Sequence, residues 1–132
     1  MLTLKMIKDW LKTLALGAEH FYIGKLDNKT EKSLGVYDMN TSVMADIALG
    51  GKENTKTGKK YITLLIHWDK NMDHTEVAAY KIYNRLSYLT NVEIEGIDVD
   101  YIELPDNEPI FVDTDKNGVY EMVINLIIYF KK

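Results

Sequence analysis

Apolar residues near the start of the chain recur at helical spacing. Those at intervals of three and four positions are Ile7, Trp10, Leu11, Leu14 and Ala18, with lysines on the opposite side. This period places the apolar side chains on one face of an amphipathic helix, which we predict over residues 2–16. Gly17 follows at once, and glycine is favoured just past the end of a helix. We therefore expect this helix to pack one face against the rest of the protein.

A second helix is predicted over residues 73–89. Asp73 is positioned to cap the amides of its first turn, and Glu76 stands three residues later, close to the spacing of a capping box. The predicted core stripe consists of Val77, Ala79, Ile82, Leu86 and Leu89. Alanine at positions 78 and 79 permits close approach to a sheet, so we expect the helix to lie on one.

Alternating apolar residues predict the strands. Residues 61–68 have largely apolar side chains on both faces, which is typical of a central strand. Residues 119–130 have one fully apolar face. Their other face carries Glu121 and Asn125 among apolar neighbours, a composition suited to contact with a helix or another subunit. The shorter predicted strands are 21–26, 34–39, 44–49 and 109–113.

The chain between the second helix and the last strand is extended and turns twice. Residues 92–104 read as extended chain with a break at Gly96. Residues 115–118 join the last two strands as a tight hairpin, because Asn117 and Gly118 tolerate the positive φ that such turns need. Hairpin-linked strands of this kind favour an antiparallel or mixed sheet.

The elements follow the order α-β-β-β-α-β-β and predict an α+β fold, with an antiparallel or mixed sheet of about five strands and two helices packed on it. The 132 residues suit a single domain, residues 1–132. The chain has no cysteine, which excludes disulfides and thiolate metal sites. Lysines interrupt the apolar N-terminal stretch, so we expect neither a signal peptide nor a membrane span.

Charge is divided unevenly along the chain, whose net charge is −4. Residues 93–106, which we call the acidic segment, contain no basic residue and include Glu93, Glu95, Asp98, Asp100 and Glu103. The lysines that precede the strongest central strand are Lys52, Lys56, Lys59 and Lys60. The acidic total argues against nucleic-acid binding, which rests on phosphate neutralisation by Lys and Arg.

The acidic segment and these four lysines are candidates for a subunit interface. Opposite charges on one chain attract each other between copies of that chain. The alternative is that they form two separate solvated faces, each of which contacts only water.

Two short motifs suggest metal chemistry. Asp113, Asp115, Asn117 and Gly118 match the first half of a calcium-binding loop, whose alternating oxygen ligands suit a hard cation. However, the twelfth position is Ile124 rather than a bidentate glutamate, and strands replace the flanking helices. A hairpin turn explains the same residues.

His67, Asp69, Asp73 and His74 lie close in sequence, as in a metal or acid–base cluster. A helix cap beside a strand end accounts for the same residues and is the favoured interpretation. The sequence contains no phosphate-binding glycine loop and no nucleophile elbow. We therefore assign no catalytic, cofactor-binding or metal-binding residue and expect no enzyme.

A series of short stretches in a fixed order carries a family resemblance. The stretches are residues 35–38, 48–51, 64–68, 75–79, 108–110 and 115–124. In this order they resemble the phage minor capsid protein family of Gram-positive phages and prophages, which is similar in kind to tail terminators. The resemblance extends over roughly three-quarters of the chain.

The resemblance implies an α+β subunit that assembles as a ring, hexameric in this kind of protein, on the end of a tail tube. The implied partners are other copies of the chain, the major tail tube protein and the head–tail connector, with DNA only as passing cargo. No membrane and no cofactor is implied. The chain would act in the virion tail or neck, after assembly in the host cytoplasm. In such a ring, a further placement of the acidic segment is the lumen, where it would repel passing DNA.

Two other functions remain open at this point. A head-completion or connector protein of the neck would have a similar fold and composition. A small metal-binding enzyme is the third candidate, based on the two motifs above.

Overall fold

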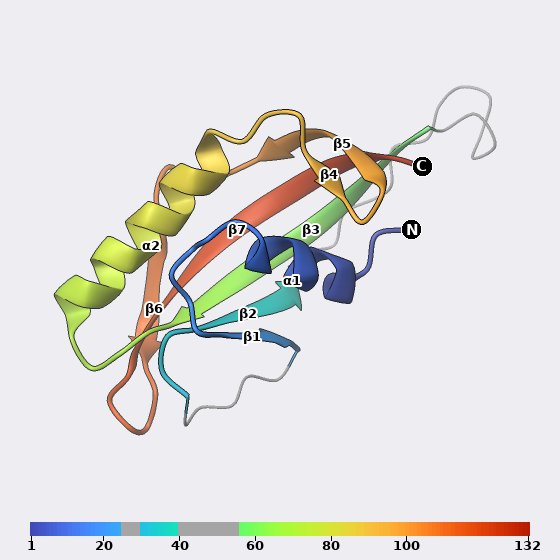
Figure 1. The fold of residues 1–132 in the computed structure, drawn as a ribbon. Helices are drawn as coiled ribbons and strands as arrows, with labels where there is room; N and C mark the ends of the chain where they lie inside the picture. Colours follow the sequence, from blue (N-terminus) through green and yellow to red (C-terminus); the bar gives the residue numbers. More distant parts are fainter. Residues whose placement is uncertain (25–29, 40–55) are drawn as a thin grey trace.

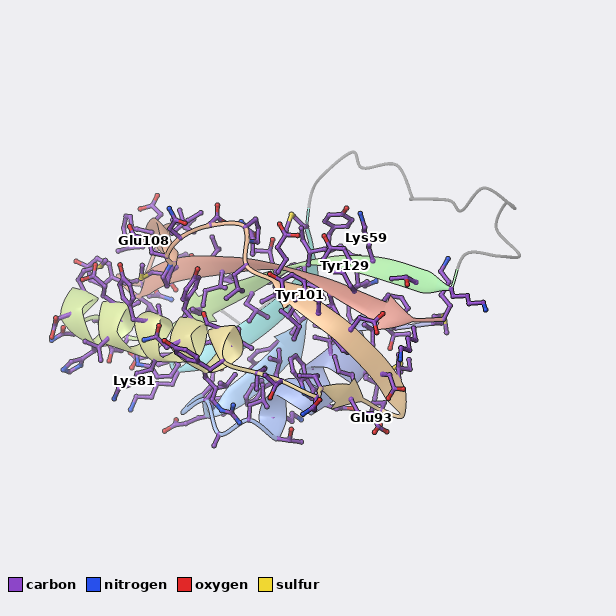
Figure 2. The ribbon with its side chains drawn as sticks, turned by 90° about the horizontal axis from the view of Figure 1, so that it is seen from above. Lys59, Lys81, Glu93, Tyr101, Glu108 and Tyr129 are labelled. Atoms are coloured by element: carbon purple, nitrogen blue, oxygen red, sulfur yellow. The ribbon has the colours of Figure 1, made fainter. Side chains whose placement is uncertain are left out.

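The computed structural model describes residues 1–24, 30–39 and 56–132. These residues form two layers, a mixed sheet and a pair of helices on one of its faces (Figure 1). The helices are α1, Leu4–Lys12, and α2, Met72–Ser87. Seen from above, both helices lie beneath the sheet, and no helix of the described ranges lies on its opposite face (Figure 2).

The sheet is built around its two longest strands, β3 (Thr57–His67) and β7 (Tyr120–Lys131). The other strands are β1 (His20–Ile23), β2 (Ser33–Asp38), β4 (Glu93–Ile94), β5 (Ile97–Glu103) and β6 (Ile110–Thr114). The order is β1-β2-β3-β7-β5-β4, and β6 pairs with the half of β7 that β5 leaves open. Only β1 and β2 run parallel among the described strands.

The core lies between the sheet and the helices. Alternate residues of the two central strands point toward the helices and are buried: Ile62, Leu64, Ile66, Met122, Ile124, Leu126 and Ile128. The helices contribute Ile7, Trp10, Leu11, Ala79, Ile82 and Leu86. Each large aliphatic side chain that is fully buried contributes about 1.5–3 kcal/mol relative to exposure, so this layer holds the fold together.

The predicted fold class is confirmed, with more strands than expected. Among the described residues seven strands are present, where about five were predicted. The extra ones come from the acidic segment, which folds back at Gly96, where φ is +82°, to form β4 and β5. The strand predicted at residues 44–49 lies outside the described residues. β3 begins at Thr57, earlier than predicted, because its start pairs with the end of β7, from Tyr129 to Lys131.

Both helices differ in detail from the prediction. α1 ends at Lys12 rather than at residue 16, because the Thr13 amide and hydroxyl close the last turn on Trp10 and Ala15 adopts a φ of +54°. α2 is capped by Asn71, whose side chain accepts from the amide of His74, so the predicted cap at Asp73 is wrong.

The predicted core stripe of α2 is wrong at one position. Val77 is 46% exposed, whereas Ala78 and Thr75 are buried. The buried positions 75, 78, 79, 82 and 86 follow the helical period, and position 77 lies about 100° away from that stripe around the helix axis. Within the described residues, neither helix is long and apolar enough to cross a membrane.

Candidate interaction surfaces

The sheet face away from the helices, which we call the open face, is partly apolar and half-buried. Its side chains from β3 and β7 are Tyr61, Thr63, Leu65, Val123, Asn125, Ile127 and Tyr129. The two polar side chains in its middle are hydrogen bonded to each other, since Thr63 Oγ1 donates to Asn125 Oδ1 over 2.7 Å. The sequence left two contacts possible for this face, a helix or another subunit. Among the described residues no helix covers it.

Tyr129 is the centre of a cross-strand ladder on the open face (Figure 2). The Lys59 ammonium lies 5.3 Å from the centre of its ring, and the ring of Tyr101 lies 5.9 Å away on the other side. The Tyr129 hydroxyl donates to Glu103 over 2.7 Å. This hydrogen bond to a carboxylate, with partial burial, raises the pKa of Tyr129 above its usual value. The ladder therefore joins β3, β7 and β5.

The structure divides the acidic segment into two parts. Glu93, Glu95 and Asp98 are exposed on the β4–β5 hairpin. Asp100 lies 3.8 Å from Lys131, and Glu103 accepts from Tyr129, so these two acids have partners within the chain. Part of the charge predicted for a subunit interface is thus used inside one subunit.

The predicted lysine group is divided in the same way. Lys56 is exposed, whereas Lys60 forms an ion pair with Asp38 over 3.3 Å and Lys59 lies over Tyr129. Lys52 lies outside the described residues. Because β3, β7 and β5 are neighbours, the described lysines and the acids Asp100 and Glu103 are brought to the same end of one sheet. The pairing of lysines and acids between copies stays a prediction.

A buried histidine occupies the other end of the open face. His67 is fully buried, and its Nδ1 lies 3.0 Å from Oε2 of Glu121. Its Nε2 lies 3.6 Å from Oδ2 of Asp115, and neither of these two atoms has a hydrogen-bond partner among the described residues. We call these three residues the His67 clamp, because they tie the β6–β7 turn to the end of β3.

The residues of the two suspected metal motifs separate in the structure. His67 belongs to the clamp, whereas His74 contacts Asp69 over 3.2 Å at the start of α2. In the other motif, Asp115 Oδ1 accepts from the amides of Asn117 and Val119, which is the bonding of a turn. Within the described ranges, no three His, Asp or Glu side chains are grouped so as to hold a metal ion.

Two further surfaces were not found from the sequence. The first is the apolar triplet of β6, where Ile110, Phe111 and Val112 are 42%, 48% and 50% exposed. The second is a groove of about 480 Å³ between the C-terminal end of α2 and β5, whose apolar lining is Leu86, Leu89, Val92, Val99, Ile102 and Leu104. The signal for the triplet was its three consecutive apolar residues, which break the alternation of a half-buried strand.

The family is decided by a comparison over nearly the whole chain. A model of the bacteriophage tail terminator protein family matches residues 4–132. The chain belongs to this tail terminator family. A search among curated proteins found no match. The expected resemblance to tail terminators is therefore confirmed.

Membership of the tail terminator family gives the chain a structural role in the phage tail and a place in the virion. Such a role is carried by surfaces that meet other tail and head components. The open face, the apolar triplet and the groove are the candidates for such surfaces in the described part of this tail terminator chain.

Proposed function

We propose that the chain assembles into a closed ring that caps the end of the tail tube, stops its polymerisation and presents a surface to the head connector. The observation that carries the proposal is the match to the tail terminator family over residues 4–132. A ring of six subunits is the number that the resemblance implies.

The surfaces of the subunit support a ring. A closed ring of identical subunits uses a heterologous contact, in which one surface of each copy meets a different surface of its neighbour. The apolar triplet on β6 and the groove beside β5 are two such non-equivalent surfaces, and both are accessible.

The open face supports a contact with the tail tube protein. It combines the aromatic rings of Tyr61 and Tyr129 with aliphatic side chains and contains few charges at its centre, as is typical of the core of protein interfaces. Its polar pair, Thr63 and Asn125, is already hydrogen bonded within the subunit, which lowers the desolvation cost of covering this face.

Deletion of the gene in the phage that encodes the chain tests the proposal. We expect electron microscopy to show tails much longer than wild type, with normal length restored when the chain is supplied in trans. Tails of normal length that are detached from filled heads would instead indicate a connector. In a purified system, adding the chain to polymerising tail tube protein should shorten the tubes, and unchanged tube lengths would refute termination.

The copy number is tested separately. Native mass spectrometry of the purified chain, and of the chain recovered from tails, should give six times the mass of one subunit. Averaged end-on images of the tail end should show sixfold symmetry. Another symmetry would refute the number while leaving termination intact.

A further inference from the structure

We propose that the outer face of α2 in one copy docks against the β4–β5 hairpin of the next copy. The outer face consists of exposed residues that lie opposite the buried stripe of the helix: Val77, Lys81, Asn84, Arg85 and the C-cap residue Tyr88. The proposal rests on the ring of the proposed function and adds a charged contact to it. It uses neither the apolar triplet nor the groove.

Two cations stand one turn apart on the outer face. Lys81 and Arg85 are both exposed, and neither forms an ion pair within the described residues. Side chains four positions apart on a helix are neighbours, and like charges at this spacing destabilise it. The helix dipole favours Arg85 in the last turn, but no acid of the described ranges offsets the repulsion between the two cations.

The β4–β5 hairpin carries two acids in a matching arrangement. Glu93 and Asp98 are exposed and lie directly opposite each other in the register of the two strands. Like charges on a directly opposite pair are destabilising. Neither acid forms an ion pair in the part of the chain that the structure describes, and Lys131 on the neighbouring strand β7 lies 3.8 Å from Asp100 instead.

The local structure of the hairpin holds both acids on its outer side. Glu95 and Gly96 join the strands with positive φ values of +49° and +82°, as in the tight turns of two-residue hairpins. Successive residues of a strand point to opposite faces, and Ile94, next to Glu93, is fully buried. Glu93 and its partner Asp98 therefore point away from the core, toward a neighbour.

The two like-charge pairs fit each other in spacing and sign. Residues four apart on a helix have Cβ atoms about 5–6 Å apart, and opposite residues of two antiparallel strands have theirs about 4.5–5.5 Å apart. Each cation of one copy can thus meet one acid of the next. The repulsion within each pair is then offset by attraction between copies, so charge complementarity selects a second copy of the chain as the occupant.

The lysines first predicted as partners of the acidic segment are less available than the α2 pair. Lys60 forms an ion pair with Asp38, and Lys59 lies over the Tyr129 ring. Both contacts are within one subunit. Lys81 and Arg85 instead keep their charges exposed on a helix that is rigidly packed on the sheet.

Exposed apolar residues accompany the cations on the outer face. Val77 is 46% exposed and Tyr88 is 82% exposed, on the side where an amphipathic helix normally carries polar residues. Tyrosine is enriched in the core of protein interfaces. The exposed acids of α2, Asp73 and Glu76, lie toward its N-terminal end, so the hairpin meets the cationic half of the helix.

The two surfaces lie at opposite ends of the subunit. Figure 2 shows Lys81 at the α2 end of the molecule and Glu93 at the end formed by the hairpin, and Figure 1 shows the same separation of α2 from β4. Two different surfaces that fit each other give a heterologous contact, which generates a ring when its rotation closes.

Reversal of the charges tests the contact. Chains with Lys81→Glu and Arg85→Glu should self-associate about tenfold more weakly than wild type, as should chains with Glu93→Lys and Asp98→Lys. A chain with all four reversals should recover wild-type association, because acids then stand on α2 and cations on the hairpin. Sedimentation equilibrium measures the association of the purified chain, and the amount recovered with tail tubes measures it on tails.

A matched control separates the contact from net charge. Lys12→Glu with Lys116→Glu changes the net charge by the same amount as the α2 reversal, at exposed positions outside both surfaces. This variant should associate as the wild type does. All reversals change exposed residues, and circular dichroism verifies that each variant is folded.

Cross-linking locates the contact, because the chain has no cysteine of its own. Asn84→Cys places a thiol on the outer face, and Glu95→Cys places one on the hairpin turn. A mixture of the two single variants, treated with a short bismaleimide, should yield cross-linked dimers. The control replaces the hairpin thiol by Ile23→Cys on the β1 edge, and this mixture should remain uncross-linked.

The outcomes separate this contact from the ring itself. Oligomers that form without the cross-link between positions 84 and 95, or that cross-link positions 84 and 23, overturn the docking of the outer face and leave the ring standing. A four-reversal chain that associates as weakly as the two-reversal chains also overturns it, as does an equal loss in the Lys12 and Lys116 control. If the chain forms no oligomer either alone or on tail tubes, the ring of the proposed function fails together with this contact.

Discussion

Removing one carboxylate from the His67 clamp should destabilise the fold. Glu121→Met keeps the side-chain length but takes away the acceptor that lies 3.0 Å from the buried Nδ1 of His67. The Glu121 side chain is 15% exposed, so water does not readily replace it. A hydrogen bond to a charged group contributes about 1.5–3 kcal/mol, and an unpartnered buried donor is left behind. We therefore expect the free energy of unfolding to fall by about 2–3 kcal/mol.

Urea unfolding followed by circular dichroism measures this loss. In a domain of this size it corresponds to a fall in Tm of roughly 10 °C. Glu93→Met is the matched control, because Glu93 is exposed on β4 and its replacement should change stability by less than about 0.5 kcal/mol. Equal midpoints for the two variants, at equal urea dependence, would show that the clamp does not stabilise the fold.

Three further predictions concern the core, the open face and the lysines. Ile82→Ala should lower the free energy of unfolding by about 2–5 kcal/mol, whereas Val77→Ala should cost under about 1 kcal/mol, both by urea unfolding. The raised pKa of Tyr129 means that the folded state holds the phenol proton more tightly than the unfolded state does. The contribution of Tyr129 to the free energy of unfolding is therefore fully present below about pH 10, the ordinary tyrosine pKa, and is lost as pH rises through the folded-state pKa. Tyr129→Phe should flatten this alkaline loss in thermal melts, and an unchanged slope would contradict it. Reversing the four lysines of residues 52–60 to glutamate should weaken oligomers most at low salt, and unchanged sedimentation there would count against their role in the interface.

The local elements followed from sequence because their signals are short-range. The period of α2 and the alternation of β3 and β7 depend on which side chains share a face, which spacing determines. The signal for the turn before β7 is likewise local, because Gly118 has the positive φ, +81°, that such a turn needs and that glycine readily adopts. The family resemblance rested on the order of such stretches, and the match over residues 4–132 confirmed it.

The surfaces depended on contacts between distant residues. His67 and Glu121 are 54 positions apart, and only the register of β3 against β7 places them opposite one another. The same register brings Tyr129 beside Lys59, and the neighbouring strand supplies Glu103, so charges predicted for an interface became internal partners.

Spacing along the sequence therefore determined the helices, the main strands and the α+β class, because these follow from how successive side chains point. Tertiary structure alone decided which face of the sheet has no helix among the described residues, that α2 exposes its valine and buries its alanines, and where the groove opens. Those features arise when separate elements pack together, and their geometry depends on non-local register and on helix phase, which no single stretch of sequence encodes.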